Sequence, residues 1–439
     1  MNTDNKQSTL SHELNHLEPQ PWYRLIFTKQ MLTCIFTGFS SGLPLFFILQ
    51  LLPAWLLSYG LSVKTIGAFS LTQMPYVFKF LWAPLLDRYG LIPFLGRRRS
   101  WMLVTQIGLL AGMALYGMLN PQAQLKWVVI LSIAVAFLSA TQDIAVDAFR
   151  REILSDKELG LGNSIHVNAY KIAGFIPGAL SLILADHLPW QMVFFITALF
   201  MLPGVLMSLL VKEPAASKLA PKTLVSSVVE PFVEFFTRQG WKYALFILAF
   251  MLLYKLGDSM ATALQSTFVL KMGFSKTDLG TINKGIGLAS SIAGGIFAGI
   301  WMLRLGINKA LWVFGVAQAL AILAFVVLAH YGPFETIGGR ERMLLALVIA
   351  SETFAMSLGT MAFVSFIART TNPSYTALQL ALFTSLTAVP RSLINASTGW
   401  LVERMGWESF FYLCMVLTIP GMLMLFKIAP WNGDKETTA

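Results

Sequence analysis

Charged residues are scarce in this chain. Of its 439 residues only 12% are charged, whereas 56% are hydrophobic; soluble globular domains carry roughly 25% charged residues. This shortage excludes an ordinary water-soluble protein and indicates that lipid surrounds most of the chain. About twelve spans of ~20 apolar residues would take up ~240 residues, which leaves no room for a large soluble catalytic domain.

Cysteine is also nearly absent. Cys34 and Cys414 lie in apolar stretches, which excludes a disulfide framework and a cysteine zinc site. His12 and His16 flank Glu13 in an H-E-x-x-H pattern, but this zinc-protease motif lies in a polar tail, outside any expected cleft. We therefore predict no metal site, no cofactor and no catalytic residues. The net charge of +10 does not imply a nucleic-acid partner, because membrane proteins gather positive residues on one side.

Apolar windows predict an all-α integral membrane protein with about twelve spans. The expected spans cover residues 30–56, 65–87, 101–119, 127–149, 162–186, 190–211, 243–270, 278–303, 310–330, 343–368, 375–402 and 407–428. With the N-terminus in the cytoplasm, 20 of the 32 Lys and Arg residues lie on the cytoplasmic side, 7 on the other side and 5 within spans. This asymmetry predicts that both termini are cytoplasmic.

The expected spans fall into two groups of six, separated by a long polar loop. We divide the chain into a cytoplasmic tail (1–29), a six-helix bundle (30–211), a cytoplasmic loop (212–242), a second six-helix bundle (243–428) and a cytoplasmic tail (429–439). Within the loop, apolar residues recur at helical spacing over 224–236, which predicts an amphipathic helix on the inner leaflet. The alternative is a plain linker.

The two halves carry an internal repeat. Residues 60–67 (GLSVKTIG) match 273–280 (GFSKTDLG), and 83–90 (APLLDRYG) match 299–306 (GIWMLRLG). The matches open and close corresponding spans in the same orientation. Six plus six spans related as parallel repeats resemble the major facilitator superfamily of transporters, which implies alternating access around a midplane site.

A charged sequence lies between the second and third expected spans. Asp87, Arg88 and Gly90, followed by Arg97 and Arg98, resemble the superfamily's G-x-x-x-D-R-x-G-R-R signature, with six residues inserted. The resemblance implies a cytoplasmic latch in which carboxylate and guanidinium groups pair when that side is shut. The alternative is that the arginines only set the topology.

Ionisable residues inside spans are costly and therefore functional candidates. Five are basic and four are acidic: Lys79, Lys171, Lys255, Lys284 and Arg391, with Asp143, Asp147, Asp258 and Glu352. We expect the acidic four to serve proton coupling. Asp143 and Asp147 lie one helical turn apart and disfavour each other's ionisation, so one of them is expected to hold a proton near neutral pH. Lys255 and Asp258, three residues apart, are expected to pair.

Several ungapped blocks are similar to the AmpG-type muropeptide permeases. They are 41–44 (SGLP), 76–82 (YVFKFLW), 142–148 (QDIAVDA), 254–258 (YKLGD) and 283–284 (NK). The resemblance implies a proton-driven permease in the inner membrane of a Gram-negative bacterium. It would import cell-wall fragments containing N-acetylglucosaminyl-1,6-anhydro-N-acetylmuramic acid, with or without peptide, for wall recycling, and so support β-lactamase induction.

A muropeptide offers carboxylates, hydroxyls and acetamido groups, which call for cationic and amide partners. The expected substrate-binding residues are Gln142, Lys171, Tyr254, Lys255, Asn283, Lys284 and Arg391. We expect a monomer with protons, the substrate and the bilayer as its only partners. Two alternatives stay open: a related permease for a siderophore or coenzyme A thioester, and a membrane-embedded hydrolase that uses Asp143 and Asp147 as acid and base.

Overall fold

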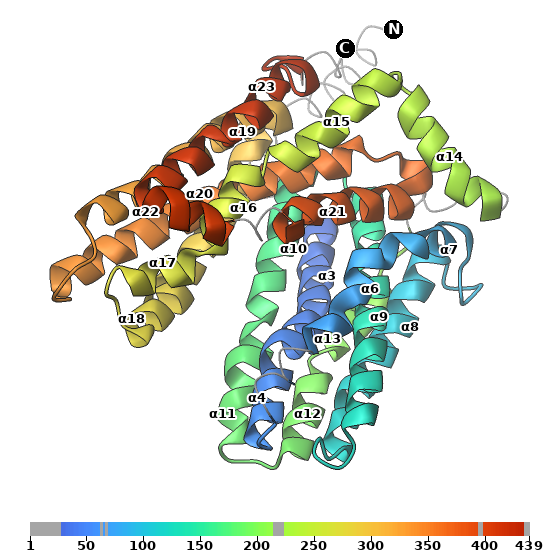
Figure 1. The fold of residues 1–439 in the computed structure, drawn as a ribbon. Helices are drawn as coiled ribbons and strands as arrows, with labels where there is room; N and C mark the ends of the chain where they lie inside the picture. The colour runs from blue at the N-terminus through green and yellow to red at the C-terminus, as the bar shows by residue number, and fades with distance from the viewer. Residues whose placement is uncertain (1–27, 62–64, 66–68, 214–223, 394–397, 434–439) are drawn as a thin grey trace, which may run out of the picture.

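The computed structural model describes residues 28–61, 65, 69–213, 224–393 and 398–433 (Figure 1). These residues form helices joined by turns, and no strand occurs among them. The H-E-x-x-H pattern at His12 lies outside the described residues.

The first half contains one group of long helices in chain order. They are α3 (Lys29–Phe46), which continues through η1 (Phe47–Leu51) into α4 (Leu52–Ser58), α8 (Arg97–Leu115), α9 (Leu125–Ile153), α10 (Leu159–Ala173), followed by η5 (Ile176–Leu180) and α11 (Ser181–Ala185), then α12 (Trp190–Leu199) and α13 (Leu202–Leu210). Because backbone N–H and C=O groups inside a bilayer must form hydrogen bonds within the protein, a membrane-spanning chain folds into helices such as these.

The second span, expected over 65–87, is divided into short helical segments. It consists of η2 (Phe69–Gln73), α6 (Met74–Phe78), η3 (Lys79–Leu81) and α7 (Ala83–Arg88). Pro75 and Pro84 stand in the first turns of α6 and α7. Proline lacks the N–H that a helix interior needs, so each one begins a new helical segment.

The second half repeats the arrangement. Its elements are α15 (Trp241–Leu253), α16 (Leu256–Ala263), α17 (Gln265–Lys271), α18 (Lys276–Thr281), η7 (Ile282–Gly287), α19 (Leu288–Tyr331), α20 (Gly339–Thr370), η8 (Pro373–Tyr375), α21 (Thr376–Leu393), α22 (Thr398–Val416) and α23 (Thr418–Ile428). Two of these elements contain a sharp bend, α19 at Gly306 (φ 73°) and α22 at Gly406 (φ 79°). Positive φ is the region that glycine adopts without steric cost.

The helices agree with the twelve expected spans. In the described part of the chain, nine helical segments are long and apolar enough to cross a membrane, and one of them, Asp278–Tyr331, is 54 residues long. That segment bends at Gly306 and holds two spans. The broken second span and α21 complete the twelve. The expected amphipathic helix is α14 (Leu224–Thr237), which contains Pro231.

The two halves meet at one end of the molecule. Figure 1 shows their helices together where α14, α7 and α21 lie, and their ribbons diverging toward the opposite end; we call the closed end the linker end. One buried apolar cluster combines Cys34 and Leu159 of the first half with Phe250 and Met361 of the second. Burial at the linker end therefore joins the halves.

Small residues allow the halves to approach closely along α10 and α19. Ser164 donates a hydrogen bond to the carbonyl of Gly295. A Cβ atom at Gly295 would collide with the side chain of Asn168, and one at Gly299 with Ser164. Close helix contact in membranes depends on such small residues.

Candidate functional site

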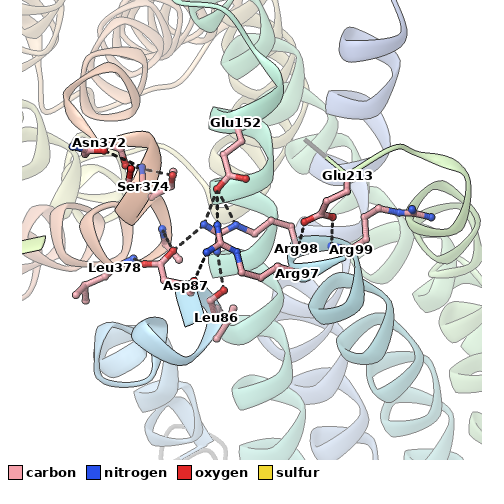
Figure 2. A network of polar contacts seen from close by, with 12 residues as sticks. Leu86, Asp87, Arg97, Arg98, Arg99, Glu152, Glu213, Asn372, Ser374 and Leu378 are labelled. Carbon is pink, nitrogen blue, oxygen red and sulfur yellow. Dashed lines mark hydrogen bonds and ion pairs between the residues drawn. The ribbon is translucent and has the colours of Figure 1, made fainter. Parts of the chain in front are cut away.

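The expected latch residues form a buried ionic network at the linker end (Figure 2). Arg98 Nη2 lies 2.8 Å from Asp87 Oδ1 and 2.6 Å from Glu152 Oε1, and Arg98 Nε donates to the same Glu152 oxygen at 2.9 Å. The side chains of Asp87, Arg98 and Glu152 are fully buried. Arg97 donates to the backbone carbonyl of Asp87. We call Asp87, Arg97, Arg98 and Glu152 the latch network.

Asp87 also connects the two halves. Its carboxylate oxygens accept the backbone N–H groups of Ala377, at 3.1 Å, and Leu378, at 2.9 Å, in the first turn of α21. The first N–H groups of a helix lack partners within the helix, and a carboxylate there is favoured by the helix dipole. The start of α21 is thus held by a side chain of the other half.

Local backbone geometry positions the arginines of the latch network. Gly96 (φ 87°) precedes α8, and Glu213 accepts the backbone N–H groups of Arg98 at 2.8 Å and Arg99 at 3.2 Å. A Cβ atom at Gly90 would lie 3.2 Å from the Cα of Arg97, so a side chain there would crowd this turn.

Two flanking arginines of the same region have contacts of their own. The Arg88 guanidinium lies 5.7 Å from the ring centre of Tyr89, a cation–π distance. Arg99 donates to the backbone carbonyls of Ser208 and Leu209. Both arginines therefore have specific contacts in the structure.

The helix α14 contacts the segment around the start of α21, which Asp87 also contacts. Tyr375 donates to Glu230 at 2.7 Å, and Asn372 and Gln379 each donate to Glu234 at 2.9 Å. Burial alone would raise the pKa of Glu234, but hydrogen bonds from Arg238, Asn372 and Gln379 lower it overall. The hydrogen bond to Glu230 raises the pKa of Tyr375 to about 12. We call Glu230 and Glu234 with their partners the linker clasp.

The two carboxylates of α9 have different partners. Ser41 donates to Asp143 Oδ1 at 2.6 Å, whereas Asp147 pairs with Arg150 at 2.9 Å. Arg150 in turn donates to Asn163 at 2.8 Å. The cationic partner of Asp147 is thus Arg150, one helical turn away on the same helix.

The predicted pair on the seventh span is present. Lys255 Nζ lies 2.7 Å from Asp258 Oδ2 and donates to Gln318 at 2.9 Å. Glu352 of α20 is only 2% exposed, and neither of its carboxylate oxygens has a hydrogen-bond partner among the described residues. Its charged neighbours are Asp258 and Lys255.

Lys171 lies at the contact between the halves. Its Nζ donates to Ser291 at 2.6 Å and to Ser357 at 3.1 Å, both in the second half. Hydroxyl groups carry no negative charge to neutralise an ammonium, and an ammonium group can bind an anionic ligand through charge-assisted hydrogen bonds. Neither serine was singled out in the sequence, since a serine within a span carries no charge signal.

Three other expected substrate-binding residues make weaker or internal contacts. Gln142 donates to Ser40 at 3.1 Å, and Asn283 accepts from Gln265 at 3.4 Å. The Tyr254 hydroxyl donates to the carbonyl of Leu311 at 2.9 Å, so its hydrogen bond lies within the second half.

For the remaining two expected substrate-binding residues, the structure describes only the position of the backbone. Lys284 lies on η7 and Arg391 on α21, and their side chains fall outside the described residues. Across the described ranges, no group of three or more His, Cys, Asp or Glu side chains gathers in a way that could hold a metal ion.

The helical architecture and the charged residues inside its spans agree with the class of protein that the comparisons identify, a membrane transporter. Residues 34–394 match the Major Facilitator Superfamily. The chain is 39% identical over 390 residues to the anhydromuropeptide permease of Escherichia coli K12, covering 88% of this chain and 77% of that protein. It belongs to the major facilitator superfamily and, within it, to the AmpG-type permease family.

Other relatives agree with this assignment. A putative transporter AmpG 4 of Rickettsia felis is 33% identical, with 89% and 94% of the two chains covered. Two solved structures share the fold: the human organic anion transporter MFSD10 (TM-score 0.67, 16% identity, 93% and 100% covered) and a bacterial ferroportin homologue in an outward-facing state (0.65, 14%, 91% and 99%). Membership of a transporter family overturns the hydrolase alternative: the chain is a multi-pass membrane transporter, not an enzyme.

Proposed function

We propose that this protein imports muropeptides across the inner membrane by proton-coupled alternating access, with both termini and the linker end in the cytoplasm. The observation that carries the proposal is Asp87, which binds Arg98 in its own half and two backbone N–H groups of α21 in the other. A contact of this kind closes one side of a transporter while the other side is open. The structure then corresponds to an outward-facing state.

The substrate follows from the relatives and from the polar groups along the seam. The E. coli relative is an anhydromuropeptide permease. A carboxylate of such a ligand fits the ammonium of Lys171, whose hydrogen bonds to described residues go to the hydroxyls of Ser291 and Ser357. Substrate would replace these two hydrogen bonds, so binding and the contact between halves would be coupled.

Proton coupling rests on Glu352 and Asp143. Glu352 is buried and has no hydrogen-bond partner among the described residues, and an ionised carboxylate in that position is costly unless it takes up a proton. Asp143 has one neutral donor, Ser41, whereas Asp147 and Asp258 each have a cationic partner within 3 Å. We assign proton binding to Glu352 and Asp143, and orientation of neighbouring groups to Asp147 and Asp258.

Uptake into vesicles tests the proposal. Right-side-out vesicles containing the protein should accumulate radiolabelled N-acetylglucosaminyl-1,6-anhydro-N-acetylmuramic acid when the outside is acidic, and a protonophore should abolish accumulation but not exchange. The Asp143→Asn variant should show the same loss without the protonophore. Accumulation that survives the protonophore would refute proton coupling.

A related permease for another amphiphilic anion remains the second candidate, since a cation such as Lys171 binds any carboxylate or phosphate. Competition separates the two. Unlabelled muropeptide should reduce uptake of the label, whereas a ferric siderophore or a coenzyme A thioester should not.

A further inference from the structure

An apolar groove of about 340 Å³ lies beside the latch network. One wall comes from the second span through Val77 and Phe80, and another from α21 through Leu382 and Leu386. The helix α14 covers it with Phe232, Phe235 and Phe236. Phe232 is 41% exposed, so the groove is open to the surroundings, which in a membrane transporter are lipid.

A second cavity, of about 200 Å³, adjoins the groove and is basic. Phe235 lines both. The charged residues of the second cavity are Arg238, at the end of α14, and Arg369, at the end of α20; no acidic residue is among its described lining residues. Thr370 and Gln239 add polar groups. We call it the basic pocket.

We propose that the groove and the basic pocket together bind one anionic phospholipid of the leaflet at the linker end. An acyl chain would occupy the groove, and the headgroup phosphate would lie between Arg238 and Arg369. Guanidinium groups are suited to phosphate because their planar donors match its oxygens. Arginines at the membrane surface attract anionic lipids.

The existing contacts of the arginines are compatible with this ligand. Arg238 pairs with Glu234 through Nε and Nη2 and donates to the carbonyl of Thr370 at 2.9 Å through Nη1, while Arg369 donates to Asn308. Both side chains are thereby fixed at the pocket. A phosphate there would meet two guanidinium groups and no carboxylate among the described lining residues.

The groove is built from both halves, so the lipid would favour the closed linker end. Val77 and Phe80 belong to the first half, and Leu248, Leu382 and Leu386 to the second. Separation of the halves at this end would divide the groove. A ligand that binds one of two states shifts the population toward it.

Lipid titration of the purified full-length protein in detergent tests the proposal. Dioleoylphosphatidylglycerol should raise the midpoint of thermal unfolding and remain bound in native mass spectrometry. Dioleoylphosphatidylcholine, glycerophosphate and inorganic phosphate should do neither. An equal shift with the phosphatidylcholine, or one reproduced by glycerophosphate or phosphate alone, would overturn the proposal.

Variants locate the site. Ser385 lines the groove and its buried hydroxyl has no hydrogen-bond partner among the described residues, so Ser385→Phe should fill the groove and abolish lipid retention. Arg369→Gln should weaken retention about fivefold, as expected for the loss of one cation near a lipid phosphate, and Arg369→Lys should restore most of it. Lys309→Gln, which removes a charge beside Trp431, is the matched control and should retain lipid.

Lipid retention that is the same in Ser385→Phe and Arg369→Gln as in the control would contradict the proposal. A monodisperse gel-filtration peak and an unchanged midpoint of thermal unfolding without lipid show that each variant is folded.

Discussion

Two buried carboxylates of this protein have opposite surroundings. Asp87 is fully buried and accepts hydrogen bonds from Arg98 and from two backbone N–H groups. Glu352 is 2% exposed and has no hydrogen-bond partner among the described residues. A partnered buried charge holds one arrangement of the halves, whereas an unpartnered acid is ready to bind a proton or a ligand. The difference separates a carboxylate that contacts both halves from one that, under the proposed function, binds the coupled proton.

Among the changes considered, removal of Asp87 should have the largest effect on stability. Asp87→Ala leaves Arg98 with one carboxylate partner and α21 without its acceptor, so we expect a loss of about 3–5 kcal/mol in the free energy of unfolding. Opening of the linker end should expose Cys34, which is buried in the apolar cluster shared by the halves. Peptide mapping after maleimide treatment should show faster labelling of Cys34.

The matched control is Asp156→Asn, because Asp156 pairs with Arg151 in an exposed position. Exposed pairs contribute roughly 0.2–1 kcal/mol. Cys34 labelling at the same rate in Asp87→Ala and in the control would show that Asp87 does not hold the linker end closed.

The ion pair of Lys255 and Asp258 should contribute less to stability than Asp87 does and more than Glu352 does. Each single variant, Lys255→Met or Asp258→Asn, leaves the other charge without its partner at 2.7 Å, whereas the double variant removes both charges. We expect an interaction free energy of about 1–3 kcal/mol in the double-mutant cycle. Chemical denaturation of the four proteins measures it, and an interaction near zero would mean that Gln318 compensates for the lost partner.

The linker clasp should contribute least to stability. Tyr375→Phe removes an exposed hydrogen bond to Glu230 and should cost about 0.5 kcal/mol. Because Glu234 has a pKa below its ordinary value of 4.5, its contribution is present above that pH and is lost as the pH falls through the lower pKa of the folded state. Thermal unfolding as a function of pH should therefore show a less steep decline in acid for Glu234→Gln than for the unaltered protein.

Replacement of Glu352 should change transport and not stability, which would sharpen the contrast with Asp87. Glu352→Gln removes no hydrogen bond between described residues, so the free energy of unfolding should stay within about 0.5 kcal/mol or rise. Proton-driven accumulation should nevertheless be lost while exchange persists. Glu335→Gln, in an exposed turn, is the control. A strongly destabilised Glu352→Gln protein would show that this carboxylate holds the structure as Asp87 does.

Much of the architecture could be predicted from the sequence because the bilayer imposes it. Span length, the repeat and the long central loop predicted two six-helix halves, and the helices agree with this division. The breaks within the second span were not predicted; Pro75 and Pro84 stand in the first turns of separate helical segments there. The pair of Lys255 and Asp258 was predictable because both lie on one helix face.

Partners from distant parts of the chain could not be predicted. Asp87 and Arg98 were predicted from their sequence pattern. Glu152 and Glu213 lie far from that pattern in the chain, and the start of α21 contributes only backbone N–H groups, so none of these partners was predicted. The repeat matches Leu303 to Asp87, so the second half carries no equivalent carboxylate.

Sequence by itself determined which residues are charged, how often they interrupt apolar helices and that two halves exist. Only the tertiary structure decided which charges neutralise one another. It placed Lys171 of α10 against Ser291 and Ser357 of the other half, and it left Glu352 without a hydrogen-bond donor among the described residues. The physical reason is that the state of a buried charge depends on atoms within a few ångströms, and helices far apart in the chain supply those atoms.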